Sequence, residues 1–300
     1  MANKNPNSTN YKHTFEPNTT DLTLAMDYDL LGRPVIRTTG APPTTLPWEY
    51  LVGVGQVEGF QNLQAFGYRE DVDAGDVRYS LWNCEEAEQI AVRDDASNDV
   101  YVISTSDQDT EQGTGARTIV VQGIDQNWDQ TSETVLLNGT SPVALLNSYR
   151  AVERVTVTTA GSQRHNVGKI FIGTGEMDDS SIAPPLIDCY VHPFDGASEI
   201  GQFVVPRNHT AFVLDSVITI GGVADFSKVT IRGYVRTESG VEYTTGALIM
   251  TAGTLQTKES VPLTIPEKTV VGYRIISAHD NESMSARIRY ILANNDYLTV

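Results

Sequence analysis

The residues best placed to bind an ion are three aspartates in an acidic loop. Asp71, Asp73 and Asp76 lie within residues 70–76, a segment that also contains Gly75. Carboxylate oxygens are the ligands that calcium prefers, and glycine lets a loop turn around the ion. However, the spacing does not match the EF-hand pattern, and no glutamate stands where a bidentate ligand is required. We therefore expect a solvated turn, with calcium bound by these three aspartates as the alternative and no other cofactor.

The remaining polar residues do not form a catalytic motif in the sequence. No Gly-x-Ser-x-Gly nucleophile elbow occurs, and the Gly-Thr-Gly segments at 113–115 and 173–175 lack the Lys-Ser/Thr of a phosphate loop. The histidines are scattered, without the spacing that places two zinc ligands on one helix face. No catalytic residue is assigned, and the chain is not expected to be an enzyme. The histidines are His13, His165, His192, His209 and His279.

Trp128 is the candidate ligand contact. It lies in the polar turn 125–130, and an exposed aromatic ring on a loop can stack on a sugar or anchor a partner protein. Alternatively, the ring folds back over its own domain as a cap, which is the interpretation we prefer.

The net charge of −17 argues against direct binding of nucleic acid. The chain has 38 acidic and 21 basic residues, whereas binding to a polyanion relies on lysine and arginine to neutralise phosphates. Its cysteines, Cys84 and Cys189, have no Cys-x-x-Cys spacing, so neither a zinc site nor a redox motif is indicated. We expect buried reduced thiols, although a single disulfide bridge between them stays open. No signal segment is apparent, and no apolar run approaches the ~20 residues of a membrane span.

The elements that must position these residues are short β-strands. Residues 118–121 and 133–137 form a predicted hairpin around the polar turn 125–130, and Asn138-Gly139 supplies a second turn because it tolerates positive φ at both central residues. Residues 84–92 are predicted as either a short helix or a loop that enters a strand. Further strands are predicted at 79–82, 100–103, 149–159, 169–172, 203–205, 210–220, 229–235, 241–243, 247–250, 261–265, 270–277 and 285–292.

This regular spacing predicts an all-β fold. With 300 residues the chain can form two antiparallel β-sandwich (jelly-roll-like) domains, at 46–185 and 186–300, with a boundary in a breaker segment that ends at Pro185. Residues 48–64 show apolar alternation interrupted by glycines. Before the domains, residues 21–39 contain two strand-like pieces around a Leu-Gly-Arg-Pro turn.

Residues 1–45 are expected to form an extended N-terminal arm and linker. Their first 20 or so residues are polar and rich in Asn and Thr, so they cannot repay the entropy of ordering by burying their own side chains. We expect neighbouring subunits to hold the arm, as an added strand. The candidate interface residues are Tyr11, Phe15, Leu22, Leu24 and Trp48.

Several segments together resemble a family of structural proteins from marine bacteriophage particles. The resemblance covers roughly residues 50–292 and does not include the first 45 residues. No catalytic residue is carried over from this family. The segments that carry the resemblance are 65–68, 113–118, 121–125, 133–140, 149–155, 166–172 and 204–211.

The resemblance implies a virion structural protein, present in many copies in a capsid shell, a decoration layer or a head fibre. Its partners are then copies of itself, as a homotrimer, and other virion proteins, with no membrane partner and with assembly in the host cytoplasm. The alternative is a tail or fibre receptor-binding module that recognises host-surface glycan through loop aromatics such as Trp128. A third hypothesis, a polysaccharide-cleaving tail enzyme, requires two carboxyl groups about 5–10 Å apart in a cleft.

Overall fold

The computed structural model describes most of the chain, which divides into two compact units, residues 1–62 and 63–300. No helix among the described residues is long and apolar enough to cross a membrane. The described residues are 25–28, 34–37, 48–75, 78–91, 93, 99–175, 184, 186–221, 229–251, 253–277 and 282–298.

The first unit contains a two-stranded sheet and one short helix. Strands β1 (Ala25–Tyr28) and β2 (Pro34–Arg37) pair antiparallel, which confirms the two strands expected on either side of the Leu-Gly-Arg-Pro turn. Helix α1 (Trp48–Gly53) occupies a segment for which strand-like alternation was expected. The i, i+3, i+4 spacing of Trp48, Leu51 and Val52 explains the helix, and the last two side chains are buried.

Two sheets in the second unit enclose the largest hydrophobic core. The core takes side chains from both sheets, including Ile103 and Phe171 from one and Ile119 and Val155 from the other. The first sheet has the order β11 (Leu186–Val191), β10 (Ile170–Thr174), β5 (Tyr101–Ser104), β8 (Val143–Ala144). The second sheet has the order β7 (Gln130–Leu136), β6 (Ala116–Ile124), β9 (Ala151–Ala160).

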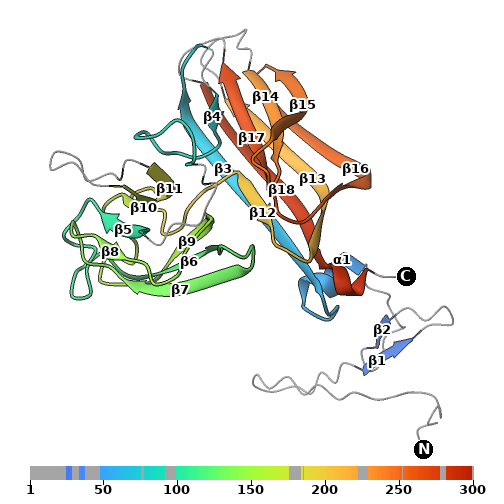
Figure 1. Ribbon diagram of the computed structural model, residues 1–300, viewed down its shortest axis with the longest axis horizontal. Coiled ribbons are helices and arrows are strands. Elements are labelled where there is room, and N and C mark those ends of the chain that lie inside the picture. Colours follow the sequence, from blue (N-terminus) through green and yellow to red (C-terminus); the bar gives the residue numbers. More distant parts are fainter. Residues whose placement is uncertain are drawn as a thin grey trace, which may run out of the picture. The chain divides into compact units, whose positions relative to one another are not determined.

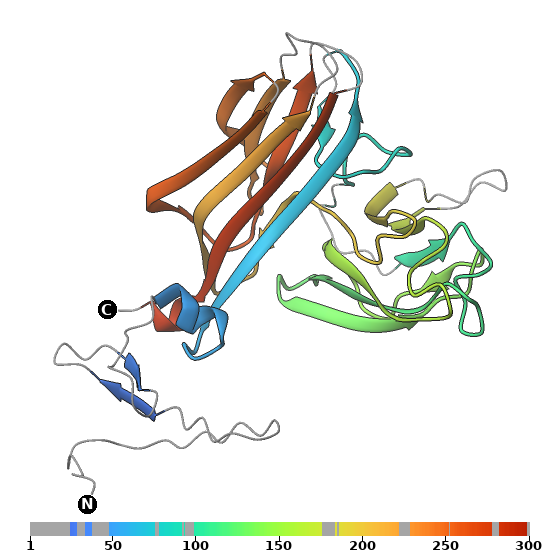
Figure 2. The ribbon, with the colours of Figure 1, turned by 180° about the vertical axis from the view of Figure 1, so that it is seen from behind.

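Two further sheets of longer strands pack face to face around their own core (Figures 1 and 2). Ile218 and Ala286 from one sheet meet Ile231 and Ile275 from the other. One sheet has the order β12 (Gln202–Val205), β17 (Thr269–Ser277), β14 (Val229–Arg236), β15 (Glu242–Met250), with β4 (Tyr79–Ser80) also paired to β17. The other has the order β16 (Gly253–Ile265), β13 (His209–Gly221), β18 (Glu282–Asn294), β3 (Phe60–Val72), and 3-10 helix η1 (Asn295–Tyr297) follows β18.

The all-β, antiparallel prediction is confirmed. The jelly-roll topology and the domain boundary near residue 185 stay predictions. The strand pairing nevertheless crosses that boundary, since β3 neighbours β18 and β4 pairs with β17. Strands from early in the chain thus complete sheets built mainly from its C-terminal third.

Two local expectations differ from the structure, and a third was left open between two alternatives. Asn138-Gly139 does not close a hairpin of its own, because only Gly139 has positive φ, 61°, in a turn closed by a hydrogen bond from the Ser141 N–H to the Asn138 carbonyl. This turn instead sends the chain to β8, which pairs with β5 in the other sheet. Of the two alternatives for residues 84–92, the structure favours the loop, because residues 84–91 form bends without a helix. The strands expected at 241–243 and 247–250 are one strand, β15.

Asp109 organises the loops beside the first core. It is fully buried, and its carboxylate accepts hydrogen bonds from the N–H groups of Ala116 (2.8 Å), Val167 (2.9 Å) and Gly168 (2.8 Å). The Ser104 hydroxyl donates a fourth bond, at 2.6 Å. One carboxylate thereby satisfies backbone donors at the start of β6 and in the loop before β10, which are distant in sequence. The sequence analysis did not identify this residue.

Replacing this carboxylate should strongly destabilise the fold. Asp109→Ala leaves three buried N–H groups without their acceptor, and each such group costs roughly 1–3 kcal/mol, so we expect a loss of about 4 kcal/mol or more in the free energy of unfolding. Urea unfolding followed by tryptophan fluorescence measures the loss. The control, Asp107→Ala, removes an exposed carboxylate that accepts a bond from Thr140 and should cost under ~1 kcal/mol. Equal losses in the two variants would contradict the organising role of Asp109.

Candidate subunit interface

Strand β15 is an edge strand that nothing in the described chain covers on its outer side. It ends its sheet, and eight of its nine residues are exposed, all except Met250. Its sequence contains neither proline nor lysine, and Glu242 is its only charged residue. Natural sheets use proline, lysine and other charged residues to prevent edge-to-edge pairing. β15 lacks most of these protections.

Two exposed side chains of β15 face the core of the two-sheet sandwich. Tyr243 is paired with Val235, and Leu248 with Ile231, and these partners are buried core residues. Because directly paired residues point to the same side of a sheet, Tyr243 and Leu248 lie on the inner face. They are nevertheless 50% and 39% exposed. The core is therefore not closed along this edge.

Strand β16 ends the other sheet, but its edge is irregular. Leu263 is paired with the buried Val213 and so lies on the inner face, where it is 50% exposed. The register shifts immediately afterwards, and the next pair joins Lys258 to Asp215. The intervening residues include Pro262, which cannot donate to a ladder. β16 thus exposes some apolar side chains, but its edge is poorly suited to pair with a regular strand of another chain.

We call these two strands together the open edge. Figures 1 and 2 show both strands along the same side of the sandwich. Exposed apolar patches of this kind mark interaction surfaces in proteins. The large apolar side chains exposed on or beside the open edge are Val241, Tyr243, Leu248, Ile249, Val261 and Leu263.

The acidic residue of β15 is paired with an arginine. Glu242 forms a salt bridge with Arg274, with 2.7 Å between Oε2 and Nη2. The Arg274 guanidinium also lies 4.6 Å from the centre of the Tyr234 ring. Arg232 is paired with Ala247 in the middle of β15. The strand is therefore flanked by cations, although the chain as a whole is strongly acidic.

The structure buries Trp128 instead of presenting it to solvent. The ring is only 6% exposed and packs with Ile124, Val204, Tyr234 and Val270. The Arg150 guanidinium lies 4.7 Å from the ring centre. Trp128 itself has φ of 66°, so the tight turn aims its side chain at strands β12, β14 and β17.

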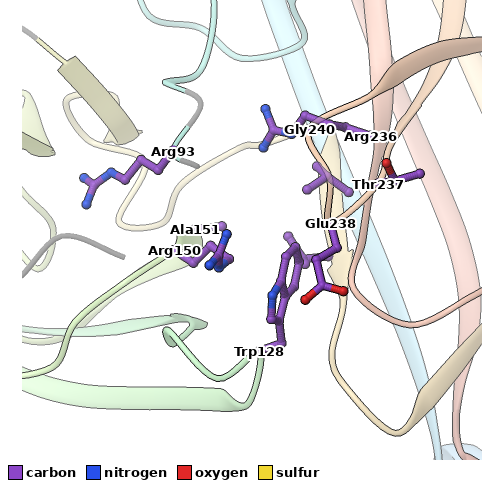
Figure 3. A pocket seen from close by; sticks show the side chains of 10 residues that line it. Arg93, Trp128, Arg150, Ala151, Arg236, Thr237, Glu238 and Gly240 are labelled. Atoms are coloured by element: carbon purple, nitrogen blue, oxygen red, sulfur yellow. The ribbon is translucent and has the colours of Figure 1, made fainter. Parts of the chain in front are cut away.

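The pocket beside Trp128 is small. Its volume is about 20 Å³, which is room for about one water molecule. Figure 3 shows Trp128 and Arg150 on one side of the pocket, and Thr237 and Glu238 on the other. A sugar ring does not fit in this volume, so the geometry lends no support to the prediction that Trp128 contacts a ligand.

Glu153 covers the edge of strand β12. Its carboxylate accepts a hydrogen bond of 2.7 Å from the Val204 N–H. Burial raises the pKa of Glu153 from 4.5 to about 7, although the bond from Val204 acts in the opposite direction. The neighbouring carboxylate also helps burial to raise the pKa of Tyr290. A carboxyl group with a pKa of about 7 therefore lies between β9 and β12.

The predicted calcium loop is only partly described. Asp71 and Asp73 are exposed, and Asp76 lies outside the described residues. No group of three or more His, Cys, Asp or Glu side chains that could hold a metal occurs in the described part of the chain. The solvated turn expected here and its alternative, bound calcium, both stay predictions.

Among the predicted interface residues, only Trp48 is described. It is 44% exposed and packs edge-on against Phe60, with ring centres 5.2 Å apart. Tyr11, Phe15, Leu22 and Leu24 lie outside the described residues. Their contact with neighbouring subunits, which would hold the N-terminal arm in place, stays a prediction.

The histidines are only partly described, and those in the described part of the chain belong to no group of three or more candidate metal ligands. Of the histidines, His165, His192 and His209 are described, and His165 packs against an aromatic ring. His13 and His279 lie outside the described residues.

The prediction of buried free thiols is confirmed for Cys84 and Cys189. Burial raises the pKa of each thiol to about 12.

The open edge was not apparent from the sequence. The apolar run at 247–250 is a pattern more typical of a buried strand, and its exposure depends on which strands pair. Only the absence of proline and lysine from 242–250 pointed to an unprotected edge.

Comparisons with known proteins do not place the chain in a family. No family model matches the sequence, and no curated protein matches it. Among solved structures, the T=1 particles derived from infectious bursal virus align at 10% identity over 79% of this chain and 70% of that chain, with a TM-score of 0.23. The VP2 subviral particle of infectious bursal disease virus aligns at 8% identity over 79% and 73%, with a TM-score of 0.22. The PBSX exported protein XepA aligns at 14% identity over 90% and 100%, with a TM-score of 0.18. Likenesses this weak carry no argument about fold or function.

The raised pKa of Glu153 predicts a specific pH dependence of stability. Since the folded state binds the proton more tightly than the unfolded state, the free energy of unfolding should fall as pH rises from 4.5 to about 7. Glu153→Gln keeps an oxygen acceptor for Val204 but cannot ionise. At about pH 8 the free energy of unfolding of this variant should exceed that of the parent by about 2 kcal/mol. The stabilities of the two proteins should converge near pH 4.5.

Thermal unfolding between about pH 4 and pH 8 measures this difference. Glu133→Gln is a control, because Glu133 also caps neighbouring backbone, accepting from Leu146 and Asn147 N–H groups at 2.9 and 3.1 Å. A Glu153→Gln variant that followed the pH profile of the parent would show that the Glu153 carboxyl does not titrate in this range.

Proposed function

We propose that the chain is a multi-copy structural subunit of a bacteriophage particle, acting through contacts between subunits. Its place would be the capsid shell, a decoration layer or a head fibre, and its two jelly-roll-like sandwiches would form the body of the subunit. The observation that carries the proposal is the open edge, where β15 and β16 expose core-facing apolar side chains. The resemblance of residues 50–292 to phage structural proteins points the same way.

An unprotected apolar edge is costly for a protein that works as a monomer. It favours irregular pairing with other chains and aggregation, and natural monomers usually block such edges. In an oligomer the same surface contributes to stability, because association buries the apolar side chains and pairs the free backbone groups. The open edge is therefore best explained as a surface that is covered in the assembled state.

The acidic composition suits a particle subunit that faces solvent. With a net charge of −17, assembled particles repel one another and stay dispersed. The same charge disfavours contact with packaged DNA, because the phosphate backbone attracts basic surfaces. We therefore propose self-association and contacts with other virion proteins, without direct binding of nucleic acid.

Residues 1–45 would serve as an arm that neighbouring subunits hold, and the assembly would be a trimer. A receptor-binding role, the alternative from sequence, gains no specific support, because the aromatic ring that suggested it is buried at Trp128. It remains a competing outcome of the experiment below.

The proposal predicts that the chain is a constituent of purified particles. Quantitative mass spectrometry of gradient-purified phage whose genome encodes this chain should find it in many copies per particle. In parallel, the recombinant full chain should form an oligomer by light scattering, and removal of residues 1–45 should reduce further assembly.

Two results would count against a structural role. One is absence of the chain from purified particles that come from a lysate containing it. The other is a monomer at every concentration, unaffected by removal of residues 1–45. Detection at only a few copies per particle, together with binding to a host glycan array, would favour the receptor-binding alternative.

A further inference from the structure

We propose that β15 pairs with β15 of a second copy of the chain, antiparallel and across a two-fold axis. The pairing would join the sheets β12-β17-β14-β15 of two subunits into one continuous sheet. This inference rests on the proposed function, since it names a two-fold contact between subunits, separate from the contacts within the proposed trimer.

The C-terminal half of β15 offers a regular ladder. Gly246 is paired with Gly233 and Thr244 with Tyr234, so Thr245 is an extra residue that forms a bulge. From Gly246 to Met250 the register with β14 is unbroken. This segment is long enough for several backbone hydrogen bonds on its free side, because alternate residues of an edge strand direct both N–H and C=O outward.

A second copy fits this segment because its sequence is complementary to itself. Across a two-fold axis, an antiparallel strand must pair with itself symmetrically about a single residue. If the centre is Leu248, Ala247 lies opposite Ile249 and Gly246 lies opposite Met250. Each small residue then faces a large one, and two Leu248 side chains meet on the inner face. No charged residue opposes another of the same sign.

The charges beside β15 allow two copies of the chain to approach each other at this strand. Two chains of net charge −17 repel each other over most of their surfaces. At β15, however, Glu242 is neutralised by Arg274, and Arg232 adds a positive charge beside Ala247. Glu242 lies outside the unbulged segment and does not enter the pairing. The edge is thus a region of low charge on an acidic chain.

The other open strand is a poorer partner. β16 contains Pro262 and Lys258 on either side of its irregular stretch, so it cannot form a continuous ladder with β15 of another copy. This leaves β15 itself as the partner that the open edge best accommodates.

Cysteine cross-linking in the full chain tests the pairing and its register. Leu248→Cys should give a disulfide-linked dimer on mild oxidation, because only a two-fold axis through this residue brings two copies of position 248 within disulfide range. Ala247→Cys and Ile249→Cys should each remain uncrosslinked alone but form a dimer when mixed. The native Cys84 and Cys189 are buried and do not compete.

A charge substitution provides a second measurement. Ile249 is 73% exposed, so Ile249→Lys should fold normally while weakening self-association at least tenfold in the dissociation constant measured by analytical ultracentrifugation. Leu146→Lys is the matched control, because Leu146 is 93% exposed and lies outside the open edge. The control should associate like the parent.

The outcomes separate this inference from the proposed function. If the chain is abundant in particles but no variant at 247–249 cross-links and Ile249→Lys associates normally, the β15 pairing is wrong and the structural role stands. In that case the arm at residues 1–45 or another virion protein covers the edge. If the chain is absent from particles but cross-links through position 248, the pairing stands and the particle role fails.

Discussion

The need to satisfy the backbone hydrogen-bonding groups at sheet edges shapes most of this structure. The free side of β9 forms hydrogen bonds with residues 196–198. A carbonyl group of β11 accepts a hydrogen bond from the Ala91 N–H, and the Val204 N–H of β12 donates one to the carboxylate of Glu153. Each solution uses a different part of the chain, but each removes an edge that another protein could extend. No described residue does this for β15.

Two side chains hold the irregular parts of the first sheets in place. Asp109, itself in a loop, accepts N–H groups from the start of β6 and from the loop before β10. Trp128 fixes the turn of the β6–β7 hairpin against β12, β14 and β17. Both act on loops, whose backbone groups have no ladder to satisfy them. Their rigidity lets a chain rich in turns present a defined surface.

The sequence predicted the class of fold well and the location of surfaces poorly. Alternation and turn residues identified most strands, such as β9 and β13, because those signals are local. They could not show that β3 joins β18, or that the apolar residues 247–250 would be exposed, since both depend on pairing between distant segments. Asp109 was missed for the same reason: its partners are assembled only by the fold. Trp128 was recognised as unusual, but its burial depends on strands more than 70 residues away in sequence.

The two cysteines of the chain are shielded from reagents in solution. Cys84 and Cys189 are its only cysteines, both are buried without a disulfide, and their thiols have a pKa of about 12. Since the thiolate is the reactive form, burial and a raised pKa slow the reaction of these thiols with oxidants in solution. The described fold contains no disulfide, so a particle built from this chain would not depend on oxidation of these two thiols after release from a cell.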